Sequence, residues 1–216
     1  MNQKIAFVHV PRTAGTSFRD QLKRSGQRVF MDYGDDPFVA GKHPHYDSID
    51  DVMKSGEFDV VAGHVKASRY ADAAKANGWA LVTWVRDPLE RLMSHYSHWV
   101  QQFWLRQMSG ATHVEFCEQR PPFMEWLKRP EVIRAMSLQL DVPPKAFDFI
   151  GQTEEYESDL CAFNLMYEAE LQPSRENADF LKLKLTDGEF EDALTLFDEA
   201  GEARAYWDFV KHESSS

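Results

Sequence analysis

Short apolar runs and helical hydrophobic patterns alternate along most of this chain. Runs rich in β-forming residues predict strands at residues 4–10, 28–32, 58–62, 80–85 and 147–150. Apolar positions at helical spacing predict helices at residues 16–24, 47–54, 67–76, 88–107, 154–169, 188–199 and 202–211, with a loop at 33–46 and short helical pieces up to about residue 137. Strands that alternate with helices indicate an α/β fold. We expect a P-loop-like parallel β-sheet with helices on both faces and a helical C-terminal part.

The longest predicted helix, 88–107, carries the clearest apolar stripe. The residues that we expect on its core face are Leu89, Leu92, Met93, Tyr96, Val100, Phe103 and Trp104. Trp99 falls beside this stripe, so a core position and a place in a binding pocket both stay open. We expect His95 and His98 of the same helix to face solvent or the mouth of a pocket, and His9 of the first strand to lie in the core or on a sheet face.

Length and composition predict one domain that spans residues 1–216. The chain is 43% hydrophobic, which is enough for a sizeable core, and it contains no Pro/Gly/Ser-rich linker. The first strand begins close to Met1, and no apolar run approaches the roughly 18 residues of a membrane span. We therefore expect a cytoplasmic protein without a signal peptide or membrane span. Cys117 and Cys161 are expected to be buried thiols, with neither a disulfide nor a zinc site.

The net charge of −11 is unevenly distributed along the chain. Residues 1–30 carry a net charge of +5, whereas residues 151–216 carry −12. An anionic ligand is therefore expected to bind residues near the N-terminus. The acidic excess makes nucleic acid a poor partner and argues against a long polyanion.

The segment between the first strand and its helix, Pro11-Arg-Thr-Ala-Gly-Thr-Ser17, is typical of an anion site. We expect Gly15 to allow a sharp turn and the helix start to direct its N–H groups at the anion. Arg12 is expected to reach over the anion from the strand side. The loop lacks the first glycine and the lysine of Gly-x-x-x-x-Gly-Lys-Ser/Thr, which counts against an ordinary nucleotide kinase. The predicted anion contacts of this loop are Arg12, Thr13, Ala14, Gly15, Thr16 and Ser17.

A second anion site is predicted where the fourth strand ends at Arg86. Asp87 is a typical N-cap, Pro88 suits the first helical position, and Glu90 completes a capping-box pattern. Ser94 lies two helical turns beyond Asp87 and therefore returns to the face of the cap. Arg86 and Ser94 can then hold the same anion.

Both motifs resemble those of sulfotransferases that use 3′-phosphoadenylyl sulfate (PAPS). Val10–Phe18 is similar to their 5′-phosphosulfate loop, and Arg86–Ser94 is similar to their 3′-phosphate motif. Val61-Ala-Gly-His-Val65 resembles the segment that supplies the catalytic base in the branch related to carbohydrate and heparan sulfate 2-O-sulfotransferases. Phe147–Glu155 resembles a later strand-to-helix segment of that branch. The likeness extends over residues 4 to 160, with Arg12 where the family usually has lysine.

The resemblance implies a sulfotransferase that moves a sulfuryl group from PAPS to a hydroxyl of a carbohydrate-like or other small acceptor and releases 3′,5′-ADP without a metal. His64 would be the general base and Arg12 would stabilise the leaving group. Arg12, His64 and Arg86 each follow a different predicted strand, so they are expected at one edge of the sheet, where such folds bind ligands. The alternative bases are His43, His45 and His98. The acceptor pocket would be built from segments 33–46, 66–70 and 100–145.

Two other functions remain open at this point. One is a phosphoryl-transfer enzyme of the P-loop type, which the missing loop lysine disfavours. The other is a catalytically silent protein that binds the nucleotide or a glycan, which the arginine at position 12 makes plausible.

Overall fold

The computed structural model describes residues 1–32, 46–105, 107, 111–173 and 181–213. Its strands form one parallel sheet in the order β2-β3-β1-β4-β5. The strands are β1 (Ile5–Val8), β2 (Val29–Asp32), β3 (Val60–Gly63), β4 (Ala80–Val85) and β5 (Phe149–Gln152). All predicted strands are present, and the α/β fold is confirmed. β1 ends two residues before the predicted boundary, where the chain turns at Pro11.

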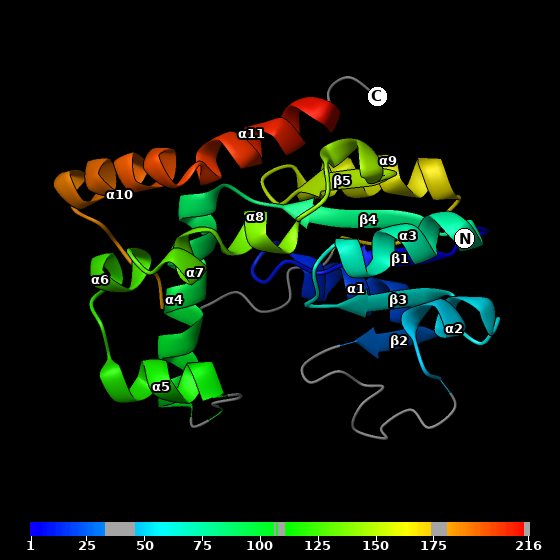
Figure 1. Cartoon of the computed structure of the whole chain (residues 1–216), viewed down its shortest axis with the longest axis horizontal. Helices are drawn as coiled ribbons and strands as arrows, with labels where there is room; N and C mark the ends of the chain where they lie inside the picture. Colours follow the sequence, from blue (N-terminus) through cyan, green and yellow to red (C-terminus); the bar gives the residue numbers. More distant parts are fainter. Residues whose placement is uncertain (33–45, 106, 108–110, 174–180, 214–216) are drawn as a thin grey trace.

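The helices follow the predicted order (Figure 1). They are α1 (Gly15–Arg24), α2 (Ile49–Lys54), α3 (Ser68–Asn77), α4 (Pro88–Trp104), α5 (Ala111–Gln119), α6 (Phe123–Leu127), α7 (Pro130–Ile133), α8 (Ala135–Gln139), the 3₁₀ helix η1 (Pro144–Ala146), α9 (Tyr156–Tyr167), α10 (Asp187–Ala200) and α11 (Glu202–Glu213). The short helical pieces expected before residue 137 are α5 to α8. The predicted loop at 33–46 lies outside the described residues up to position 45.

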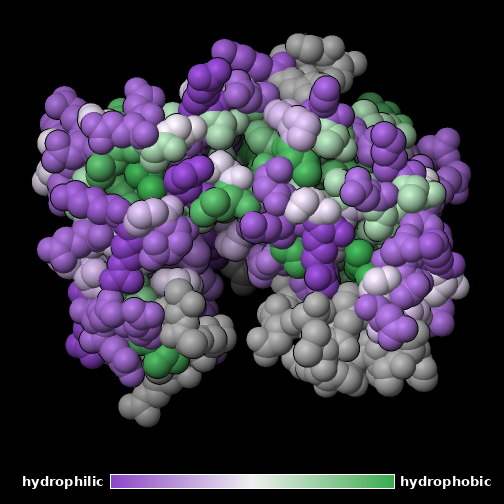
Figure 2. All heavy atoms as spheres, in the orientation of Figure 1, coloured by the Kyte–Doolittle hydropathy of each residue, from purple (hydrophilic) through white to green (hydrophobic). Residues whose placement is uncertain are grey.

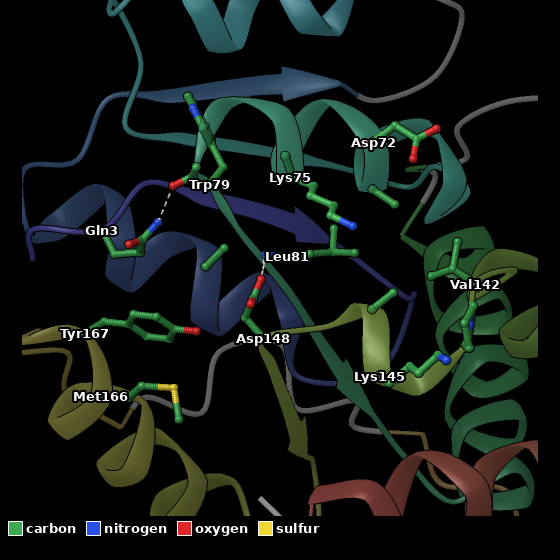
Figure 3. A pocket seen from close by; sticks show the side chains of 16 residues that line it. Gln3, Asp72, Lys75, Trp79, Leu81, Val142, Lys145, Asp148, Met166 and Tyr167 are labelled. Carbon is green, nitrogen blue, oxygen red and sulfur yellow. Dashed lines mark hydrogen bonds between the residues drawn. The ribbon is translucent and has the colours of Figure 1, made fainter.

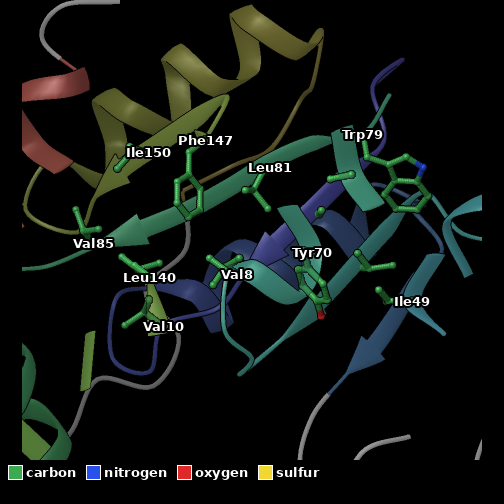
Figure 4. Close-up of a cluster of buried hydrophobic side chains, with 14 of the residues drawn as sticks. Val8, Val10, Ile49, Tyr70, Trp79, Leu81, Val85, Leu140, Phe147 and Ile150 are labelled. Atoms are coloured by element: carbon green, nitrogen blue, oxygen red, sulfur yellow. The ribbon is translucent and has the colours of Figure 1, made fainter. Parts of the chain in front are cut away.

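Every residue of the central strand β1 is buried, because helices cover both faces of the sheet. Phe7 of β1 packs with Phe18 of α1 and with residues of α9 in one apolar cluster. Val8 points to the other face and belongs to a cluster with residues of α2, α3 and α11, part of which is drawn in Figure 4. Alternate side chains of one strand thus stabilise two layers of helices.

A third apolar cluster joins α4 to α5, α6, α7 and α10, beside the sheet (Figure 1). Leu89 and Leu92 of the predicted stripe are buried there. Trp104 was expected on the core face, but α4 ends at this residue, which is 70% exposed. Trp99 packs against Phe116 and Trp126 inside the cluster, which favours a structural position.

Two expectations from composition have mixed outcomes. Neither cysteine forms a disulfide; Cys117 is buried, but Cys161 is exposed on α9, contrary to the expectation of two buried thiols. Among the described residues, no helix combines the length and apolar character needed to cross a membrane.

Candidate active site

The three residues expected at one edge of the sheet follow three neighbouring strands. Arg12 follows β1, His64 follows β3, and Arg86 follows β4. The order β3-β1-β4 is parallel, so all three residues lie beyond the same carboxyl edge. This edge is where open α/β sheets bind their ligands, because the chain runs from β1 to one side of the sheet and later crosses to the other.

Two hydrogen bonds join the predicted anion motifs. Arg12 Nε donates to Ser94 Oγ at 3.0 Å, and Arg86 Nη1 donates to the Arg12 carbonyl oxygen at 3.4 Å. From the sequence, Arg12 was expected with the loop and Ser94 with Arg86. In the structure, the Arg12 side chain instead links the loop to α4, and the two motifs are in direct contact.

The loop after β1 turns at residues other than its glycine. Arg12 and Ala14 have positive φ angles of 69° and 61°, whereas Gly15 begins α1. A Cβ atom at Gly15 would lie 2.1 Å from Cδ2 of His9, so Gly15 is needed for close packing. The expectation that Gly15 makes the sharp turn is therefore wrong. His9 is buried, as expected, and its ring separates the start of α1 from Phe7.

The hydroxyl groups of the loop are not equivalent. Thr13 is fully buried, and its Oγ1 donates to the Val10 carbonyl oxygen at 2.8 Å, so this hydroxyl hydrogen stabilises the loop and is not available to a ligand. Ser17 is also buried, whereas Thr16 is half-buried. The first helical hydrogen bond runs from Phe18 N–H to the Ala14 carbonyl oxygen. The N–H groups of residues 15–17 therefore precede the helical ladder and point toward the loop, as an anion site requires.

The start of α4 is fixed as the sequence predicts, with one difference. Asp87 is the N-cap, and its Oδ1 accepts from the Glu90 N–H at 2.9 Å. The reciprocal bond of a capping box, from the Asp87 N–H to the Glu90 carboxylate, is not formed, because Glu90 Oε2 accepts from Arg86 Nη2 at 3.3 Å. Glu90 is exposed, so an incoming anion competes with a weak surface ion pair for Arg86.

His64 is held by one ring nitrogen. Its Nδ1 lies 2.7 Å from the His9 carbonyl oxygen. Because a carbonyl oxygen only accepts, Nδ1 carries the proton and the lone pair of the neutral ring lies on Nε2. Desolvation by the surrounding protein lowers the pKa of His64 below its usual range, although the bond to His9 opposes the shift and the Arg19 charge adds to it. The ring is nevertheless accessible to solvent. A neutral, accessible imidazole can take a proton.

Gly63 sets the position of His64. A Cβ atom at Gly63 would lie 2.1 Å from the Asp32 carbonyl oxygen, so another residue would displace the end of β2. The Asp32 carboxylate is buried and accepts from Arg69 Nε at 2.8 Å and from the Tyr70 hydroxyl at 3.1 Å. Arg69 belongs to segment 66–70, which was expected near an acceptor, and it is engaged in this structural network.

Two polar residues of α4 lie close to the site, although the sequence did not predict their positions. Arg91 is fully buried, and its Nε and Nη2 atoms have no hydrogen-bond partner within the described part of the chain. Burial lowers the pKa of Arg91 to about 10, so the guanidinium stays charged at neutral pH. Only its spacing could have indicated this position: Arg91 follows Asp87 by four residues and precedes Ser94 by three, so the three residues share one helix face.

His95 was expected to face solvent or the mouth of a pocket, but in the structure it is half-buried among aromatic residues. Its Nδ1 is buried without a partner among the described residues, and its ring packs on Trp99 and Trp126 at 4.6 and 5.7 Å between centroids. Burial lowers the pKa of His95 well below its usual range, and the charges of Arg91 and Arg12 act in the same direction. His95 therefore stays neutral behind the site. His98 is half-buried one turn further along α4.

The space in front of this edge is partly visible in Figure 2. A hollow lies on this face beside α4 and α5, on the side toward the sheet. Most of the expected acceptor segment 33–46, including His43 and His45, lies outside the described residues. Among the described residues, no cluster of three or more His, Cys, Asp or Glu side chains could hold a metal ion.

A separate cavity of about 920 Å³ lies at the opposite edge of the sheet (Figure 3). Leu81 at the start of β4 and Asp148 before β5 line it, together with Lys75, Lys145 and Tyr167. The cavity faces the amino ends of the strands, so it belongs to a different region from Arg12, His64 and Arg86.

Comparisons with known proteins identify the family of the chain and a similar fold. Residues 1–177 match the sequence model of the sulfotransferase family. No curated protein matches the sequence significantly. The fold is similar to that of the mouse sulfotransferase SULT7A1 complexed with PAP, with a TM-score of 0.50 and 11% identity. The aligned region covers 90% of this chain but 64% of the mouse protein, so the chain spans less than two thirds of that relative.

Proposed function

We propose, since this chain belongs to the sulfotransferase family, that it transfers a sulfuryl group from PAPS to a hydroxyl acceptor. The observation that carries the proposal is the junction of the two anion motifs, in which Arg12 bonds Ser94 and Arg86 bonds the Arg12 carbonyl group. A nucleotide with phosphate groups at both its 3′ and 5′ positions fits one surface with two anion sites. The mouse relative with PAP, which is 3′,5′-ADP, supports this choice of nucleotide.

In the proposed complex, each motif holds one end of the nucleotide. The N–H groups at the start of α1 would bind the 5′-phosphosulfate, since they precede the helical ladder and carry the positive end of the helix dipole. Arg86 and Ser94 would bind the 3′-phosphate at the start of α4. Arg12 would lie between the two groups, and its guanidinium would stabilise charge on the leaving 5′-phosphate.

The proposed reaction is an in-line transfer. The acceptor oxygen forms a bond to sulfur while the bond from sulfur to the bridging oxygen of the phosphosulfate breaks. The acceptor proton passes to His64 Nε2, and the electron pair of the broken bond stays on the phosphate of 3′,5′-ADP. Arginine stabilises that phosphate by charge alone, because its pKa above about 12 prevents it from acting as an acid.

The acceptor is proposed to be a neutral or weakly charged hydroxyl compound, such as a sugar. This choice is supported by the resemblance of Val61–Val65 to the branch related to carbohydrate sulfotransferases and by the acidic C-terminal third of the chain. A metal has no step in this reaction.

The test is turnover of sulfur-labelled PAPS against a panel of sugars, glycolipids and phenols, with wild type and His64→Ala. We expect transfer by wild type, a loss of about 10²–10⁴-fold in His64→Ala, and unchanged affinity for 3′,5′-ADP. Because the pKa of His64 is lowered, the wild-type rate should stay constant near neutral pH and decline only below about 6.5, where an ordinary histidine titrates.

Three results would change the proposal. Tight 3′,5′-ADP binding without transfer to any acceptor would favour the silent binding protein. Magnesium-dependent turnover of ATP would favour phosphoryl transfer. Full transfer by a folded His64→Ala protein would assign the base to another group.

A further inference from the structure

The carbonyl oxygen of His9 accepts two side-chain hydrogen bonds. His64 Nδ1 lies 2.7 Å from this oxygen, and Gln139 Nε2 donates to it at 2.8 Å. We infer that Gln139 is a positioning residue, which acts through the His9 carbonyl group to hold the His64 ring in the orientation that directs Nε2 at the acceptor. The catalytic meaning of this inference rests on the proposed function, whereas its structural part does not.

Gln139 contacts two segments that border His64, the residue after β1 and the start of α3. Its side chain reaches the end of β1, and its own carbonyl oxygen accepts from the Ala67 N–H at 2.7 Å. Ala67 is the N-cap of α3 and follows His64 by three residues. One residue therefore fixes the strand end on which the imidazole rests and the helix start into which the His64 turn leads.

Gln139 is itself held in place because α8 is anchored at its other end. The Glu202 carboxylate is fully buried and accepts from the N–H groups of Met136 and Ser137 at 3.1 and 3.2 Å. A carboxylate at the N-terminal end of a helix is favoured by the orphan N–H groups there. The position of Gln139 relative to His64 is thus determined by α11 as well as by the sheet.

The shared carbonyl oxygen also links Gln139 to the protonation of His64. A carbonyl oxygen has two lone pairs, and the two donors occupy both. An imidazolium donates more strongly than a neutral imidazole, so this oxygen favours protonated His64. A second donor withdraws electron density from the oxygen and weakens that preference. Gln139 therefore helps to keep His64 neutral and able to act as a base.

Other groups act on the same ring and stay constant when Gln139 is changed. Among the described residues, the titratable and charged groups that influence His64 include His9 just after β1, Arg19 of α1 and His95 of α4. The Gln139 amide is uncharged, so its removal does not alter their charges. Burial lowers the pKa values of His9 and His95 well below the usual range, so neither is expected to titrate together with His64.

The experiment is an NMR titration of the His64 ring in the full chain, with wild type, Gln139→Met and Gln139→Glu. His64→Gln identifies the signals by their loss. Methionine keeps the length of the side chain but removes the donor, and glutamate adds a negative charge. We expect the pKa of His64 to rise by roughly 0.5–1 unit in Gln139→Met, and further in Gln139→Glu. Leu138→Met, at an exposed neighbouring position, is the control and should leave the titration unchanged.

The kinetic readout follows the same shift. The acid limb of the sulfuryl-transfer rate should move to higher pH by the same amount, with the KM for PAPS unchanged. Unaltered His64 titration and ring tautomer in both folded variants would overturn the inference. Gln139 would then have only a structural role, in which it holds α8 against the sheet. The titration needs neither PAPS nor acceptor, so it is decided separately from the proposed function. If Gln139→Met does not fold, Gln139→Leu takes its place, because it also removes the donor, whereas the charge of Gln139→Glu by itself raises the pKa of His64.

Discussion

At the residue scale, Arg12 is the group on which the two motifs depend. Its carbonyl oxygen accepts from Arg86, and its Nε donates to Ser94, although its backbone lies in the left-handed region with φ of 69°. A non-glycine residue in that region costs about 1–2 kcal/mol. Such strain persists where the surrounding structure enforces it, often at binding sites. We propose that this strain is retained because it places the Arg12 cation between the two proposed phosphate positions.

Substitution of Arg12 tests whether its charge faces the leaving group. Arg12→Ala should lower kcat at saturating PAPS by about 10²–10³-fold, the usual effect of removing one such electrostatic contact. Arg12→Lys keeps the charge, restores the residue usual in the family, and should keep or increase the rate. Both variants have a Cβ atom, so the backbone strain is matched. An Arg12→Ala enzyme as fast as wild type would mean that backbone N–H groups alone stabilise the leaving phosphate.

Arg91 is a second cation near the proposed anion site, and it is buried in the fold. Its buried side chain lies on the helix face shared by Asp87 and Ser94. Burial is the main cause of its lowered pKa, and the nearby Arg86 charge adds to the shift. The Glu202 charge acts in the opposite direction. A buried guanidinium with incomplete hydrogen bonding is costly in the free protein. It also adds positive potential at the start of α4, where an anion would bind.

At the element scale, the start of α1 is determined by how closely the helix approaches β1. Gly15 is the first residue of the helix and lies against the His9 ring. Ala14, its N-cap, provides the left-handed turn with φ of 61°. Both adjacent positions therefore favour glycine, but for different reasons: position 14 because of its left-handed backbone conformation, and position 15 because a Cβ atom would clash with the His9 ring.

Reciprocal substitutions separate these two requirements. Ala14→Gly relieves the left-handed strain and should raise the free energy of unfolding by about 0.5–1 kcal/mol. Gly15→Ala forces a methyl group into the His9 ring and should destabilise the protein by about 1–3 kcal/mol, the usual cost of overpacking. Chemical denaturation of both variants measures the difference. Equal stability of Gly15→Ala and wild type would show that the α1 start moves away from His9 without cost.

The sequence predicted the elements well because strand and helix patterns are local. It also brought Arg12, His64 and Arg86 to one edge, since the carboxyl ends of parallel strands follow from the alternation of elements. It could not predict that Arg12 turns to Ser94, because that contact depends on how α4 lies across the sheet. The bond from Gln139 to His9 joins residues 130 positions apart and depends on the docking of α8. Such contacts are set by packing and not by local pattern.

At the scale of the whole molecule, buried histidines couple stability to pH. Burial lowers the pKa values of His9 and His95 well below 6.5, so the unfolded chain binds these protons first. Their contribution to stability is complete above about pH 6.5 and is lost progressively as the pH falls toward and through their lowered folded-state values. Each histidine adds at most about 1.4 kcal/mol per pH unit to this loss.

Denaturation curves between pH 5 and 7.5 check this coupling. Wild type should lose stability as the pH falls, and His95→Phe should show a shallower slope because one buried titrating group is absent. A His95→Phe slope identical to that of wild type would mean that His95 takes up its proton in the folded protein as readily as in the unfolded chain.

The central claim is that the strand ends after β1 and β4 form one site for a nucleotide with phosphates at both its 3′ and 5′ positions. The most direct measurement is isothermal titration of the full chain with 3′,5′-ADP and with 5′-AMP, for wild type and Arg86→Ala. The account predicts that wild type binds 3′,5′-ADP far more tightly than 5′-AMP. Arg86→Ala should weaken 3′,5′-ADP binding by about 1.5–3 kcal/mol, the usual contribution of a charged hydrogen bond, and leave 5′-AMP binding nearly unchanged. Equal affinities of wild type for the two nucleotides would contradict it.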